Sequence, residues 1–109
     1  MNYYKAALVY KLTHDGLVNF EKRILTVNAI DEKEAFQTLL IKAAQTLLTL
    51  QQSNTNWEYI GLHEFENILI APHHIEMITT VADFNDMDSF IYDIKQYVET
   101  LSNKIGLSA

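Results

Sequence analysis

The hydrophobic pattern of this chain changes period along its length, and this constrains the fold more than any other feature. Between residues 3 and 13, apolar side chains recur at every second position, which is typical of a strand with one buried face. Those positions are Tyr4, Ala6, Leu8, Tyr10 and Leu12. Between residues 34 and 50 the apolar spacing becomes helical. The sequence therefore predicts an α+β protein.

The turn after the first strand predicts a β-hairpin. His14-Asp15-Gly16 combines a polar turn with a glycine that tolerates positive φ, so a second strand is expected from about residue 17 to 30. Within that strand the apolar phase shifts from Val18 and Phe20 to Leu25 and Val27. An inserted residue produces such a shift, so the pattern predicts a bulge near Lys22-Arg23.

Two helices are expected, each with recognisable ends. Asp31 has the side chain of an N-cap, and Glu34 stands three residues later, so the first helix should begin there and continue to Leu50. A second amphipathic helix is expected from Asn85 or Asp86 to a C-terminal cap at Gly106.

Two further strands are expected at residues 57–70 and 75–81, joined by a turn at Pro72 into a second hairpin. The element order is then ββαββα. We predict a two-layer sandwich in which a mostly antiparallel four-stranded sheet carries both helices on one face. Residues 1–109 are expected to form a single globular domain.

The composition excludes several classes of protein. The chain has no cysteine, which rules out a disulfide framework, a thiol nucleophile and a thiolate metal site. Its start lacks the pattern of a signal peptide, and no apolar run reaches the length of about 20 residues needed to cross a bilayer. We expect a cytoplasmic protein that does not bind membranes.

Acidic residues are concentrated in one stretch that lacks lysine and arginine. Between Lys42 and Lys95 lie eight of the fourteen acids and no base. Such a field favours cationic partners and repels nucleic acid, for which Lys22-Arg23 is the only adjacent basic pair. The charge pattern therefore predicts a basic protein partner and no direct contact with nucleic acid.

The partner is expected to bind at the second hairpin, where acids, histidines and aromatic residues cluster. The candidate residues are Trp57, Glu58, Tyr59, His63, Glu64, Glu66, His73, His74 and Glu76. The histidines and carboxylates could also ligate a metal, but no closed ligand spacing appears, so exposed loop histidines are the favoured interpretation. Trp57 and Tyr59 could equally be sheet-packing residues. Gly61 marks a bulge or a point of close packing.

Catalytic and cofactor motifs are missing from the sequence. None of the serines stands in a nucleophile elbow, and the three glycines are isolated, so no phosphate-binding loop can form. Glu64 and Glu66 share a strand face and could form a catalytic carboxylate pair. Acids on an exposed strand usually serve solubility and discourage edge pairing, and this is the favoured interpretation. We therefore expect a protein that is not an enzyme and holds no cofactor.

Three segments resemble a family of small bacterial proteins catalogued only as a domain of unknown function. The resemblance rests on residues 4–12, on residues 25–35 and on the W-E-Y-I-G strand at residues 57–61, and it covers about the first two thirds of the chain. Relatives usually have little after the last strand, whereas this chain adds a full amphipathic helix. The resemblance brings no known activity and no catalytic residues.

These observations leave three functional hypotheses. The first is an acidic inhibitor or immunity protein that neutralises a basic partner, such as a bacterial nuclease toxin. The second is a self-associating structural or regulatory domain that forms a homodimer through a sheet face or edge. The third is an enzyme that binds a small molecule between sheet and helices, which would require a deep pocket containing His63 among buried carboxylates.

Overall fold

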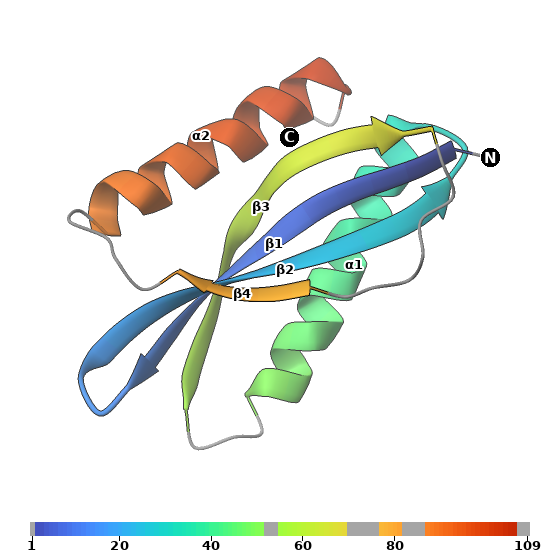
Figure 1. The fold of residues 1–109 in the computed structure, drawn as a ribbon. Coiled ribbons are helices and arrows are strands. Elements are labelled where there is room, and N and C mark those ends of the chain that lie inside the picture. Colours follow the sequence, from blue (N-terminus) through green and yellow to red (C-terminus); the bar gives the residue numbers. More distant parts are fainter. Residues whose placement is uncertain (1, 52–54, 70–76, 82–86, 107–109) are drawn as a thin grey trace.

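Four strands and two helices follow one another in the order that the sequence predicts (Figure 1). The computed structural model describes residues 2–51, 55–69, 77–81 and 87–106. The elements are β1 (Asn2–His14), β2 (Leu17–Ala29), α1 (Glu32–Leu50), β3 (Asn56–Ile68), β4 (Met77–Val81) and α2 (Met87–Lys104). The α+β class is confirmed.

The sheet differs from the predicted one. Three long antiparallel strands, in the order β2-β1-β3, carry the core, and β4 is a five-residue segment that pairs with β2 at the far edge. The predicted sheet of four comparable strands is therefore wrong, because three strands form the sheet that carries the core and β4 is only a short edge segment. The predicted second hairpin is also wrong, because β3 and β4 lie at opposite edges of the sheet. Apolar patterning identifies strands, but the order in which strands pair depends on contacts distant in sequence.

The β1–β2 hairpin forms as expected around its turn. Asp15 and Gly16 have φ angles of 50° and 77°, so the glycine stands where positive φ is required. The register then runs without interruption from His14↔Leu17 to Asn2↔Ala29. The predicted bulge near Lys22-Arg23 is therefore wrong.

Burial on both faces of β2 explains its change of apolar phase. Phe20 is fully buried against α2, whereas Leu25 and Val27 pack toward α1 on the opposite face. The strand keeps its register and changes the face that it buries. A bulge and a change of buried face give the same sequence pattern.

Helix α1 covers one face of the sheet. Its N-cap is confirmed, since the Asp31 carboxylate accepts a hydrogen bond of 2.8 Å from the Glu34 N–H. Phe36, Leu39 and Ala43 are buried against β1, where the Tyr10 hydroxyl donates a 2.9 Å hydrogen bond to the Ala43 carbonyl. The period-two residues of β1 form the sheet side of this core.

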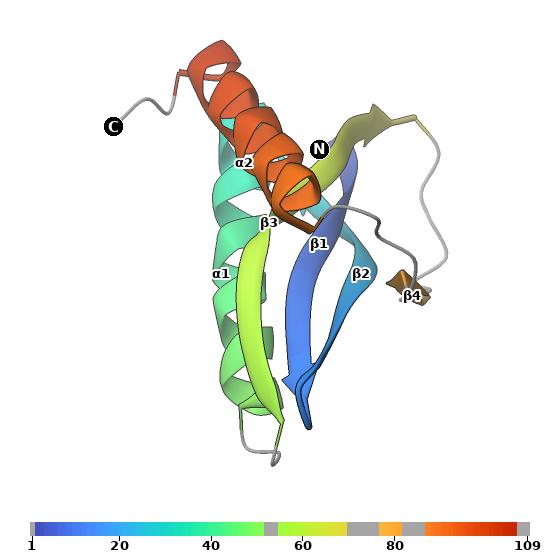
Figure 2. The same cartoon turned by 90° about the vertical axis from the view of Figure 1, so that its left-hand side faces the viewer.

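Helix α2 lies along β3 and packs on the other face, so the prediction of both helices on one face is wrong (Figures 1 and 2). Ile94 packs with Val9, Phe20 and Ile60 in a core cluster separate from the one beneath α1. Toward its C-terminus the helix reaches around the sheet edge, because Leu101 joins the α1 cluster. Both faces of β1 are buried as a result.

Strand β3 contains the irregularities that the sequence places near Gly61. Its register against β1 shifts twice, between Val9 and Tyr10 and between Lys5 and Ala7. Near the second shift Glu64 has a φ of 58°, which non-glycine residues seldom adopt. A Cβ at Gly61 would lie 2.8 Å from the Ile94 Cγ2 atom, so the predicted close packing is confirmed.

The end of α2 also matches its sequence signal. The Ile105 N–H donates to the Leu101 carbonyl, and Gly106 has a φ of 79°, as a C-terminal cap requires. The expected start at Asn85 or Asp86 lies outside the described residues. No helix in the described part of the chain is long and apolar enough to span a membrane.

Candidate protein-binding surface

The acids of β3 meet basic residues across the sheet. Glu66 lies 3.2 Å from the Lys5 Nζ atom, and Glu64 lies 3.5 Å from the Lys22 Nζ atom. Glu58 is exposed and stands in register with Lys11. The charge imbalance along the sequence is therefore partly compensated in space, because the first hairpin supplies bases to the base-free stretch.

His63 lies at the contact between β3 and α2. Its ring meets the Tyr97 ring edge-on, with centroids 4.8 Å apart, and its side chain remains 36% exposed. The Nδ1 atom lies 3.9 Å from a Glu64 carboxylate oxygen and has no hydrogen-bond partner among the described residues. The imidazole thus contributes packing to the α2 contact, with one edge reaching solvent.

Trp57 and Tyr59 lie on the α1 side of the sheet. Both rings pack against the Tyr10 ring, with centroid distances of 6.5 Å for Trp57 and 5.5 Å for Tyr59. Both residues are half-buried and pack against the α1 core cluster. They share one strand face, and that face is covered by the helix.

The Tyr59 hydroxyl is buried and has no hydrogen-bond partner among the described residues. Burial, and secondarily the neighbouring Tyr10, raises the pKa of this phenol well above its ordinary value of about 10. Because the folded state holds this proton more tightly than the unfolded chain does, the free energy of unfolding is not changed by this group below about pH 10 and falls as the pH rises above it.

We expect Tyr59→Phe to remove part of the alkaline decline in stability. Above about pH 10 the free energy of unfolding of the native chain should fall by up to about 1.4 kcal/mol per pH unit more steeply than that of the variant. At pH 7 the variant should be unchanged or slightly more stable, since it loses an unpaired buried hydroxyl. Urea unfolding at pH 7, 10 and 11 measures both effects, and parallel pH profiles would contradict them.

Three of the predicted partner-binding residues, His73, His74 and Glu76, lie outside the described residues. The other six all lie on β3, where Trp57 and Tyr59 pack against the α1 core cluster and His63 contacts Tyr97 of α2. The remaining three, Glu58, Glu64 and Glu66, are exposed. Within the described ranges, no three histidine or carboxylate side chains come close enough to hold a metal ion.

A different acidic surface lies on the solvent side of α2, which we call the α2 acidic face. It consists of the exposed residues Asp88, Tyr92, Asp93 and Glu99. Tyr92 is 62% exposed, and Asp88 and Glu99 stand four residues before it and seven after it on the same side of the helix. No ion pair joins these three acids to a base within the described chain, although the exposed Lys95 lies on the same side of the helix, three residues after Tyr92 and four before Glu99. The face combines an aromatic side chain with acids that have no ionic partner there.

The contact surface predicted from the sequence, the second hairpin, includes neither Tyr92 nor the acids of α2. A signal was present, since Tyr92 falls outside the apolar stripe that contains Phe90, Ile94 and Tyr97. A large aromatic residue opposite the buried side of an amphipathic helix indicates an exposed contact residue.

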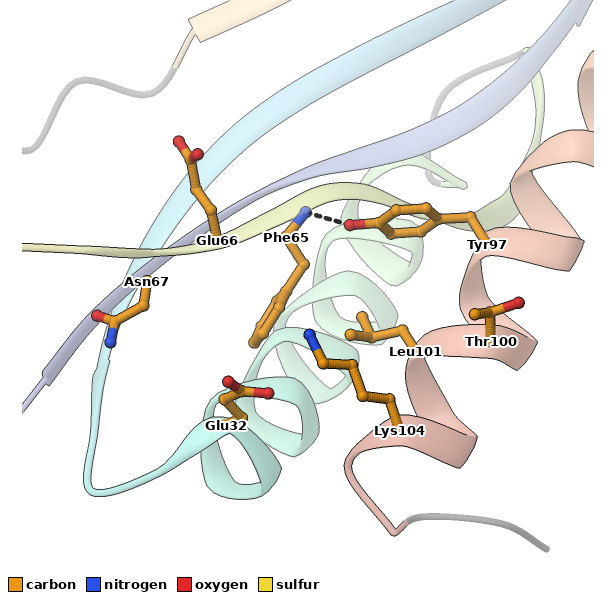
Figure 3. A pocket seen from close by; sticks show the side chains of 8 residues that line it. All are labelled: Glu32, Phe65, Glu66, Asn67, Tyr97, Thr100, Leu101 and Lys104. Carbon is orange, nitrogen blue, oxygen red and sulfur yellow. Dashed lines mark hydrogen bonds between the residues drawn. The ribbon is translucent and has the colours of Figure 1, made fainter.

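A pocket of about 300 Å³ opens between the end of β3, the start of α1 and the last turns of α2 (Figure 3). Its lining residues are Glu32, Phe65, Glu66, Asn67, Tyr97, Thr100, Leu101 and Lys104. Glu32 and Lys104 approach from opposite helices, and the Phe65 N–H donates a 2.7 Å hydrogen bond to the Tyr97 hydroxyl oxygen. His63 is not part of this lining, so the pocket lacks the combination that the enzymatic hypothesis requires.

The resemblance to the family of unknown function stays a prediction. No family model, no curated protein and no solved structure matches this chain.

Proposed function

We propose that this protein binds a basic protein partner through the α2 acidic face and neutralises it, as an inhibitor or immunity protein neutralises a bacterial nuclease toxin. The observation that carries the proposal is Tyr92, 62% exposed among acids that have no ionic partner in the described chain. Exposed tyrosines are frequent anchors of protein interfaces. We place this interaction in the cytoplasm.

Electrostatics favours α2 over β3 as the contact surface. Glu64 and Glu66 are already engaged by Lys22 and Lys5, so a partner would have to compete with existing ion pairs. Asp88, Asp93 and Glu99 have no such competitor among the described residues. Their field, together with the net charge of −6, steers a basic protein toward the helix.

The packing of α2 makes this surface rigid. Ile94 is buried at 1% exposure, and its Cγ2 atom fills the space above Gly61. The Tyr97 hydroxyl also ties the helix to the β3 backbone at Phe65. A surface held in this way loses little conformational entropy when it binds, which favours affinity.

Capture from the lysate of the native host tests the proposal. At low salt the immobilised protein should retain a basic protein whose own activity falls on complex formation, and the complex should survive salt that removes a generic basic protein such as cytochrome c. A bait with Asp88→Asn, Asp93→Asn and Glu99→Gln should retain much less of it, whereas a Glu64→Gln and Glu66→Gln bait should perform like the native chain. Retention of no basic protein at low salt would contradict the proposal.

A further inference from the structure

The solvent side of α1 exposes large apolar residues. Ile41 is 59% exposed and Leu48 is 67% exposed, and between them lies the exposed Ala44. Leu40, at 37% exposure, widens the strip on one flank. These residues face away from the α1 core, which Phe36, Leu39 and Ala43 supply from the other side. Within the described residues, the strip therefore takes no part in either core cluster.

Ala44 and Leu48 lie in a stretch without charge, whereas Ile41 is next to the exposed Lys42. Residues 43–57 contain no acidic or basic side chain, although 20% of the whole sequence is charged. Depletion of charge is typical of the central part of a protein interface. In a chain with a net charge of −6, a neutral face is also where two copies can approach without like-charge repulsion.

The spacing of the strip is self-complementary. Ile41, Ala44 and Leu48 stand at i, i+3 and i+7, which places them along one side of the helix. In an antiparallel pair of α1 helices with the two-fold axis at Ala44, Ile41 of each copy lies against Leu48 of the other. The small alanine at the axis lets the two backbones approach closely.

The β3 edge and the α1-side sheet face offer less to a second copy. The β3 edge carries two register irregularities and exposed acids, and the Phe65 N–H is already bonded to Tyr97. The α1-side face of the sheet is already covered by α1 of the same chain. Self-association is therefore best served by the outer side of α1.

We infer that two copies of this chain associate through α1, with Ile41, Ala44 and Leu48 at the centre of the contact. This inference is independent of the proposed function, because the α2 acidic face lies on another helix. A contact of one helix per chain is small, so association should be weak and should depend on concentration.

Sedimentation velocity over a hundredfold concentration range tests the inference. The weight-average mass should rise from 12.6 kDa toward twice that value. Leu48→Lys should weaken association at least tenfold. Leu17→Lys serves as the matched control, since Leu17 is 70% exposed at the start of β2, and should leave association unchanged. Thermal unfolding should show that both variants fold.

A cysteine cross-link locates the contact. The chain has no cysteine, so Ala44→Cys introduces a single thiol, which should form an intermolecular disulfide under mild oxidation. Gln96→Cys, on the exposed side of α2, should form far less. A mass of 12.6 kDa at every concentration would overturn the inference, and the strip would then be a contact surface for a molecule other than a second copy. Association that Leu48→Lys does not affect, or equal cross-linking at both positions, would overturn the assigned contact.

Discussion

Gly61→Ala is expected to lower the free energy of unfolding by about 1–3 kcal/mol. The added Cβ atom would lie 2.8 Å from the Ile94 Cγ2 atom and 3.2 Å from the Val98 Cγ2 atom. Both are methyl groups on β-branched side chains, which cannot rotate aside easily. Helix α2 must shift away from β3 or the side chains must leave their preferred rotamers. Urea denaturation followed by circular dichroism measures the loss.

A double-mutant cycle shows whether the contact causes that loss. Ile94→Ala alone should cost about 2–5 kcal/mol, because Ile94 is buried in the second core cluster. In the double variant the shorter of the two contacts is removed and only the one with Val98 remains, so the combined cost should be smaller than the sum of the single costs. In a strand without such a contact, Gly→Ala normally stabilises by about 0.5–1 kcal/mol. A stabilised Gly61→Ala variant would therefore contradict the packing described for α2.

Tyr92→Ala is expected to weaken binding of the basic partner by at least about 2 kcal/mol, which corresponds to about 30-fold in affinity. The loss should lie mainly in the dissociation rate, since the phenol provides contact area. Asp88→Asn with Glu99→Gln should instead slow association and reduce its dependence on salt. Surface plasmon resonance at two salt concentrations separates the two effects.

The α2 substitutions should leave the fold intact, because the residues are exposed and none of them packs in either core cluster. Glu66→Gln is the matched control. It neutralises an acid that Lys5 already engages, so it should change the association rate little. If Glu66→Gln lowered the association rate more than Asp88→Asn with Glu99→Gln, the binding surface would lie on β3 and not on α2.

Local features of the fold were predictable from short sequence signals. The Asp31 cap, the Gly16 turn, the Gly106 cap and the close packing at Gly61 each depend on a few neighbouring residues, and all are confirmed. In such places the backbone conformation or the steric space admits few residue types.

The arrangement of the elements was not predictable in the same way. A helix that covers the opposite face of a sheet has the same apolar stripe as one that covers the near face, so α2 could not be placed from its own pattern. The buried Val9 was the available signal, because it alternates with Leu8 and Tyr10, which are buried on the other face. A central strand with apolar residues in both phases indicates layers on both sides.

The candidate site shows the same difference between sequence and space. The base-free stretch predicts an acidic second hairpin, but Lys5 of the adjacent strand β1 reaches Glu66, and Lys22 of β2, one strand further away, reaches Glu64. Charge counted along a sequence omits bases that other strands of the sheet contribute. The acids of α2 form no ion pair within the described chain, because no strand runs beside the outer side of the helix; the one base near them is the exposed Lys95 of the same helix.

Amide chemical-shift mapping of the labelled protein with its captured basic partner tests the central claim most directly. We expect the largest changes between Asp88 and Glu99 on α2, whereas amides of α1 and of the paired acids on β3 should change little. Largest changes at Glu64 and Glu66, with the amides around Tyr92 unaffected at saturation, would contradict it.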